Sequence, residues 1–176
     1  MAILRKSLRQ SPSLRSALKE RLKGAGRITL LGIGSRFRGD DAAGLIVAEK
    51  VAESKGTPRL KVLLGETAPE NMTGVIRKSK PTHIILVDAA DFKKKPGTVR
   101  LVKPEEATGA CFCTHQLPLQ IMVDYLTKTM GSEVLIIGIQ AKTLSFGSAM
   151  GEPVRKAALN LSSVLTAAIK EALRNK

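Results

Sequence analysis

Aromatic and cysteine residues are scarce in this chain of 176 residues. With no tryptophan and one tyrosine, it offers few of the side chains on which nucleic-acid bases stack. The two cysteines, Cys111 and Cys113, are separated by one residue, so a disulfide framework is not expected. No apolar run reaches the roughly 18 residues that a membrane span needs. These absences predict a cytoplasmic protein with no membrane span.

Basic residues are abundant and unevenly distributed. The net charge is +14, and residues 1–27 alone carry eight Lys/Arg and one Glu. We therefore predict a basic N-terminal extension over residues 1–27 and a single domain over residues 28–176. A polyanion-binding surface, a transit peptide and a steering surface for an acidic protein partner are alternatives for the extension. No nucleic-acid-binding motif is recognisable, so we predict no nucleic-acid partner.

The extension also has a helical pattern. Ser11-Pro12 resembles an N-cap followed by a first-turn proline, and Leu14, Leu18 and Leu22 then recur every four residues. This spacing predicts a short amphipathic helix that docks on the domain. We expect removal of residues 1–24 to leave the fold intact and to slow the encounter with a partner.

Apolar strands alternate with amphipathic helices along the rest of the chain. Strands are predicted at residues 28–33, 60–64, 83–87, 97–102 and 133–139, and helices at 41–53, 67–79, 117–130 and 153–174. The helix at residues 67–79 begins with Thr67-Ala68-Pro69-Glu70, which has the form of a capping box. Continuous apolar strands between helices predict an α/β fold whose mostly parallel sheet is covered on both faces.

In such sheets ligands bind at the carboxyl ends of the strands. The first strand is followed by the loop that carries Asp40 and Asp41, and the third strand by Asp88. The fifth strand ends at Gln140, and His115 lies in a loop before the fourth helix. We therefore expect several carboxylates and one imidazole at one edge of the sheet.

The glycine-rich loop "GIGSRFRGDD" does not fit a phosphate site. Phe37 stands where the dinucleotide fingerprint needs its third glycine, and no Gly-Lys-Ser/Thr follows. Adjacent aspartates would also repel a pyrophosphate. Helix capping explains one of the two aspartates, Asp40, so Asp41 is the candidate functional residue. A buried Asp88 must be paired, metal-bound or a cap, because burying a charged carboxylate is otherwise costly.

The two histidines differ in their surroundings. His83 opens a strand and is predicted to be structural, whereas His115 lies in a loop. Asp41, Asp88 and His115 would supply two oxygen ligands and one nitrogen ligand, a set that suits nickel or zinc with coordination positions left open. The same residues could instead act as a general base and its partners.

Several motifs together resemble the NiFe-hydrogenase maturation endopeptidases, particularly those of the hydrogenase 3 type. The motifs are "GIGSRFRGDDAAG", "GETAPEN", "ILVDAADF" with "KPGTVRL", "THQLPL", and "LIIGIQ" leading to "MGEPVRKA". Their order and spacing cover nearly all of residues 28–173. Ser35 is a departure, because the family usually has asparagine there.

The resemblance implies a three-layer α/β sandwich with a twisted five-stranded sheet. It also implies an endopeptidase that removes the C-terminal extension of the hydrogenase large-subunit precursor after nickel insertion. Asp41, Asp88 and His115 correspond to the family's metal-contacting positions, which are implied to bind nickel carried by the substrate. No tightly bound resting cofactor is expected. A non-catalytic metal-binding chaperone or docking module of the same fold is the alternative function.

Overall fold

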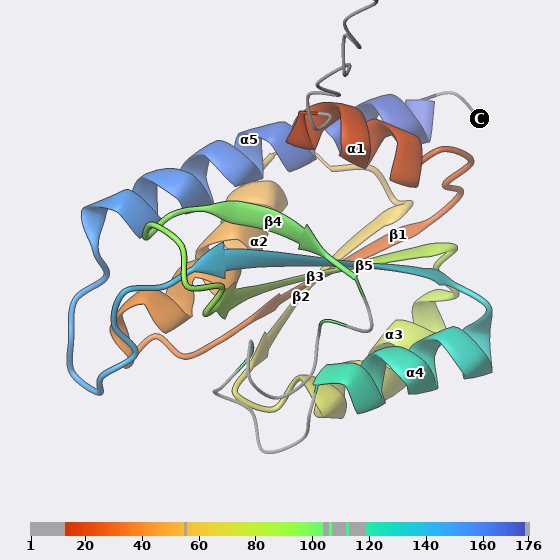
Figure 1. Cartoon of the computed structure of the whole chain (residues 1–176). Coiled ribbons are helices and arrows are strands. Elements are labelled where there is room, and N and C mark those ends of the chain that lie inside the picture. The colour runs from red at the N-terminus through yellow and green to blue at the C-terminus, as the bar shows by residue number, and fades with distance from the viewer. Residues whose placement is uncertain (1–12, 55, 104–105, 107–111, 113–118, 175–176) are drawn as a thin grey trace, which may run out of the picture.

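The computed structural model describes residues 13–54, 56–103, 106, 112 and 119–174. These residues form three layers, with a twisted sheet between two layers of helices (Figure 1). The strands are β1 (Ile28–Ile33), β2 (Leu60–Glu66), β3 (His83–Ala90), β4 (Val99–Val102) and β5 (Glu133–Gln140). The α-helices are α1 (Leu14–Arg21), α2 (Ala43–Glu53), α3 (Thr73–Ser79), α4 (Leu119–Met130) and α5 (Glu152–Arg174), and the 3-10 helices are η1 (Gly39–Ala42) and η2 (Pro69–Met72).

The strand order creates a switch point in the middle of the sheet. The order is β2-β1-β3-β5-β4, with β4 antiparallel to β5 and the other pairs parallel. The chain leaves β1 toward β2 on one side, and then returns to place β3 on the other side of β1. The carboxyl ends of β1 and β3 therefore border the crevice where open α/β sheets bind ligands.

Both faces of the sheet are apolar, as the continuous hydrophobic strands predict. Along β3, Ile85 and Val87 pack in the core on the side of α1, α2 and α5, while Ile84 and Leu86 pack in the core that contains α3 and α4 side chains. Figure 1 shows the same division, with α3 and α4 below the sheet and α1 and α5 above it. This arrangement confirms the predicted α/β fold class.

Helix α2 lies unusually close to the switch point. A Cβ atom added to Gly44 would lie 2.2 Å from the Val87 carbonyl oxygen on β3 and 2.4 Å from the Ile33 carbonyl oxygen on β1. A Cβ added to Gly32 would lie 2.4 Å from the Gly44 oxygen. Glycine is needed at both positions because any side chain would push the first turns of α2 away from the sheet.

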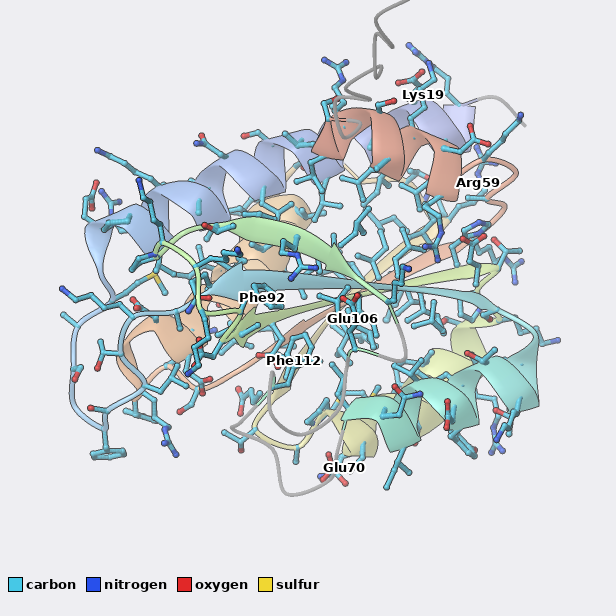
Figure 2. All side chains as sticks on the ribbon, in the orientation of Figure 1. Lys19, Arg59, Glu70, Phe92, Glu106 and Phe112 are labelled. Carbon is cyan, nitrogen blue, oxygen red and sulfur yellow. The ribbon has the colours of Figure 1, made fainter. Side chains whose placement is uncertain are left out.

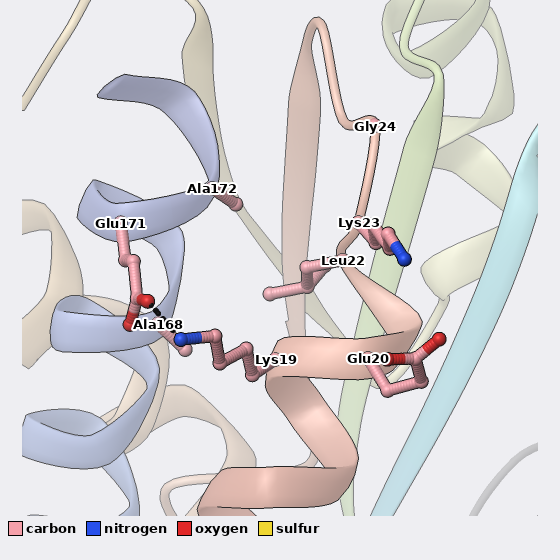
Figure 3. A pocket seen from close by; sticks show the side chains of 8 residues that line it. All are labelled: Lys19, Glu20, Leu22, Lys23, Gly24, Ala168, Glu171 and Ala172. Atoms are coloured by element: carbon pink, nitrogen blue, oxygen red, sulfur yellow. Dashed lines mark ion pairs between the residues drawn. The ribbon is translucent and has the colours of Figure 1, made fainter. Parts of the chain in front are cut away.

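The N-terminal helix is part of the packed structure. Ser13 caps α1 by accepting a hydrogen bond from the Ser16 amide at 3.2 Å, and Leu18 and Leu22 are fully buried in the core beside α5. Lys19 pairs with Glu171 at 2.6 Å and lowers the pKa of that carboxyl group (Figure 3). The docked helix thus begins at Leu14, later than the predicted Ser11-Pro12 start, and residues 1–12 lie outside the described part of the chain.

These contacts revise the expectation for N-terminal truncation. Removing residues 1–24 should lower the free energy of unfolding by about 4 kcal/mol or more. The reason is that truncating a single buried leucine already costs about 2–5 kcal/mol. Urea denaturation of the truncated and full-length proteins measures the difference. Equal stability of both would show that α1 contributes nothing to the core.

Two other local predictions differ from the structure. Thr67 does not cap the following helix, because η2 begins after Ala68 with no side-chain capping bond and passes into α3 at Thr73. Strand β3 runs to Ala90 rather than to residue 87, so Asp88 lies within the strand.

Among the described residues, no helix is long and apolar enough to cross a membrane.

Candidate active site at the carboxyl edge of the sheet

Asp41 lies in η1, immediately after the glycine-rich loop that follows β1. Its side chain is fully buried. The loop can turn this tightly because Gly34 has φ +133° and a Cβ there would lie 1.8 Å from the Asp41 carbonyl oxygen. Gly34 therefore lets the backbone of η1 approach the end of β1.

Asp88 lies on β3, next to β1 in the sheet, and is also fully buried. Its Oδ1 atom accepts a hydrogen bond from the Ala89 amide at 2.7 Å. Gly138 is the register partner of Asp88 on β5, and a Cβ there would lie 2.3 Å from the Phe92 ring. The missing side chain at residue 138 thus leaves room for the Phe92 ring against β5 (Figure 2).

The fold brings the two aspartates to the same part of the switch point. Gly44, one helical turn after Asp41, packs against the Val87 carbonyl, which directly precedes Asp88. Helix η1 itself lies against β3. The elements that carry Asp41 and Asp88 therefore pack together at the carboxyl edge of the sheet.

His115 lies outside the described residues, so its predicted place at this edge stays a prediction. The described residue nearest to it in sequence is Phe112, which is buried in the core that also contains Leu86 and Ala90 of β3 (Figure 2). Strand alternation places Asp88 on the same face as Leu86 and Ala90. Among the described residues, no three acidic, histidine or cysteine side chains gather closely enough to hold a metal ion.

Asp40 has a different role from the predicted helix cap. Its Oδ2 accepts hydrogen bonds from the amides of Lys142 at 2.7 Å and Thr143 at 3.1 Å, and its Oδ1 accepts one from Gly151 at 2.7 Å. The Asp40 amide donates to the Thr143 carbonyl at 3.0 Å. The fully buried Asp40 side chain therefore ties the loop before Asp41 to the segment between β5 and α5, and its own helix η1 has no side-chain cap.

A pocket of about 160 Å³ opens at the ends of β1 and β2, and neither Asp41 nor Asp88 is among its lining residues. It is lined by Gly34, Ser35, Arg36, Phe37, Leu45, Glu66 and Thr67. Glu66 is exposed and has φ +50°, a left-handed backbone that is uncommon for glutamate and concentrates at functional sites. The hydrogen bond from Arg36 to Glu49 raises the pKa of Arg36, and Glu66 acts in the same direction. Sequence patterns gave no signal for the Glu66 conformation, because it results from the irregular β1–β2 register beside Gly65.

Gln140 and His83 have structural roles. The Gln140 side-chain oxygen accepts hydrogen bonds from the amides of Phe92 at 2.7 Å and Lys94 at 3.1 Å, so it shapes the turn after β3. His83 begins β3 at the amino edge of the sheet, where Nδ1 lies 2.9 Å from the Thr82 hydroxyl and Nε2 lies 3.5 Å from Glu133. His83 pairs with Ile28 at the start of β1, so it lies at the opposite edge of the sheet from the carboxyl ends of β1 and β3.

The fold is a three-layer α/β sandwich in which Asp41 and Asp88 are buried on elements that meet near the switch point. Comparison with known proteins shows that the hydrogenase maturation protease family, HycI, matches residues 45–168. The hydrogenase 3 maturation protease of Escherichia coli K12 is 38% identical over 130 residues, which are 73% of this chain and 81% of that protein. The chain belongs to the hydrogenase maturation protease family.

Solved structures agree with this assignment. The crystal structure of the [NiFe] hydrogenase maturation protease HycI from Thermococcus kodakarensis has a TM-score of 0.82 and 32% identity, and covers 88% of this chain and 99% of its own. The solution structure of the E. coli endopeptidase HycI has a TM-score of 0.72 and 34% identity, and the match covers 80% of this chain and 90% of that chain. The predicted family and fold are thus confirmed.

Proposed function

We propose that this protein removes the C-terminal extension of a NiFe-hydrogenase large-subunit precursor after nickel has been inserted. Membership of the maturation protease family supports the peptidase activity and the class of substrate. The observation that supports a cation-dependent site is the burial of both Asp41 and Asp88 on elements that pack together at the switch point. Two buried carboxylates suit a cation far better than a phosphate or a carboxylate ligand.

In this proposal Asp41, Asp88 and His115 bind the nickel that the precursor carries. Two carboxylate oxygens and one imidazole nitrogen match the preferences of a borderline divalent metal, and three protein ligands leave positions for the ligands that the substrate supplies. The metal then serves as the feature by which a loaded precursor is recognised. The free protein is proposed to hold no resident metal, because a tightly bound ion would occupy the place of the substrate's nickel.

The nearby loops would hold the polypeptide around the metal. Ser35 and Glu66 line the pocket at the ends of β1 and β2. A carboxylate near the scissile bond can accept a proton from an attacking water as a general base.

Processing of a defined precursor tests this function. Purified protein should remove the C-terminal extension from nickel-loaded precursor and leave nickel-free precursor uncut, because only the loaded form supplies the metal. Mass spectrometry of the precursor's C-terminus measures both reactions. Equal cleavage with and without nickel would contradict nickel recognition. Binding of the loaded precursor without any cleavage would favour the chaperone or docking alternative.

A further inference from the structure

Two of the chain's four phenylalanines are exposed together beside the candidate active site. The side chains of Phe37 and Phe146 are 68% and 81% exposed, their ring centroids lie 6.1 Å apart, and their planes are inclined by 26°. The other exposed large apolar side chains among the described residues, Val75, Ile121 and Tyr125, are 41–52% exposed. Exposed aromatic rings of this kind are typical of surfaces that bind another molecule.

The two rings stand on loops that are fastened to each other. The Gly147 amide donates to the Phe37 carbonyl at 2.7 Å, and Arg38 Nε donates to the Leu144 carbonyl at 3.0 Å. Buried Asp40 adds its hydrogen bonds to the amides of residues 142, 143 and 151. Figure 1 shows the two loops together at the end of the sheet. The Phe37–Phe146 pair is therefore held in place before any partner binds, which lowers the entropic cost of binding.

The position of the pair identifies the molecule that would cover it. Phe37 precedes Asp41 by four residues in the same segment after β1, and it lines the pocket at the ends of β1 and β2. A polypeptide that reaches the two aspartates would extend past these rings. A small ion at the aspartates would not need them, so the rings favour a polypeptide substrate over a free metal ion as the occupant.

The charged residues around the rings indicate which side chains that polypeptide would carry. Arg36, Arg38 and Lys142 are exposed on the same two loops. Arg36 pairs with Glu49, and exposed Glu66 lines the same pocket as Phe37. In the described part of the chain no carboxylate lies within ion-pair distance of Arg38 or Lys142, so these two residues form the basic margin of the rings. An apolar surface with a basic margin is complementary to an apolar side chain that has acidic neighbours.

We propose that the Phe37–Phe146 pair is a docking site for the precursor, and that it binds an apolar side chain flanked by acidic residues in the polypeptide near the scissile bond. This inference rests on the proposed function, because the same precursor must enter the site. Docking by the pair is uniform binding: it holds the ground state and the transition state equally and so acts on KM rather than on kcat.

Steady-state processing of the nickel-loaded precursor tests the docking site. Phe146→Ser should raise KM by about tenfold and change kcat by less than about twofold, as expected for loss of one aromatic anchor. Phe146→Tyr should restore KM to near the wild-type value because it keeps the ring. Ile121→Ser is the matched control, since Ile121 is 52% exposed on α4, and its KM should equal that of the wild type. Lys142→Gln should raise KM at low salt, with the difference disappearing at about 0.5 M salt as screening removes the charge effect.

The outcomes separate this inference from the proposed function. A wild-type protein that cleaves the precursor, together with a Phe146→Ser variant of unchanged KM, overturns the docking site and leaves the function standing. A wild-type protein that neither cleaves nor binds the precursor overturns both. Light scattering adds a further distinction, because a Phe146→Ser variant that changes oligomeric state at unchanged KM would assign the rings to contact with a second copy of this chain.

Discussion

Replacing either buried aspartate by asparagine, in Asp41→Asn or Asp88→Asn, should reduce processing of the nickel-loaded precursor by at least about 100-fold. An amide keeps the shape and one hydrogen-bonding oxygen but loses the charge that a divalent metal needs. Even residues that only orient metal ligands cost about 10–100-fold when they are changed, so a ligand itself should cost more. The initial rate of precursor cleavage measures the effect, and a melting curve confirms that each variant is folded.

Neighbouring residues provide matched controls for this loss. Asp40→Asn should lower the free energy of unfolding by about 1–3 kcal/mol, because an amide nitrogen cannot accept the hydrogen bonds that both Asp40 oxygens receive from the 142–143 and 151 amides. Its activity should therefore fall together with its stability, unlike that of the Asp41 and Asp88 variants. A folded Asp41→Asn or Asp88→Asn variant with wild-type activity would overturn the site.

Substitutions of the two histidines should differ in their effects on processing and on stability. His115→Ala should abolish processing and leave the melting temperature nearly unchanged, whereas His83→Ala should keep processing while losing some stability at the amino edge of β3. His83 is 6% exposed and lies beside Thr82 and Glu133, so its role is in packing and hydrogen bonding. A fully folded but inactive His83→Ala variant would contradict this division of roles.

Gly44→Ala should be strongly destabilising, with a loss of more than about 3 kcal/mol. The added methyl group would meet two backbone carbonyl oxygens, those of Val87 and Ile33, and neither can move without displacing a central strand. Because α2 would shift away from the end of β3, the separation of Asp41 and Asp88 would change as well. Urea denaturation gives the stability, and precursor cleavage the effect on the site.

Gly74→Ala is the matched control for Gly44→Ala. Gly74 is also helical, in α3, but nothing lies within 4 Å of a Cβ built there. Alanine should therefore stabilise the protein by about 0.5–1 kcal/mol through its higher helix propensity. If Gly44→Ala proved as stable as Gly74→Ala, the close approach of α2 to the sheet would not be a real constraint.

Much of this protein could be predicted from its sequence, because the relevant signals are local. Apolar runs bounded by glycine and charge located β1 and β5 to within a residue, and the order of strands and helices indicated a covered, mostly parallel sheet. Asp41 and Asp88 could be selected because each follows an apolar strand segment, and parallel strands present such positions at one edge. Asp41 and Asp88 also lie in the motifs that resemble the family, and the comparisons confirmed the family.

The tertiary structure decided what depends on residues far apart in the chain. Asp40 has the residue type and position of a helix cap, yet its partners lie more than 100 residues away, beyond any local pattern. The basic N-terminal segment suggested a removable extension, but Leu18 and Leu22 complete the core beside α5. Phe37 and Phe146 have no pattern in common and meet only because two loops are joined by hydrogen bonds. Periodicity reports which face of an element is apolar, whereas such pairings exist only once the elements have packed.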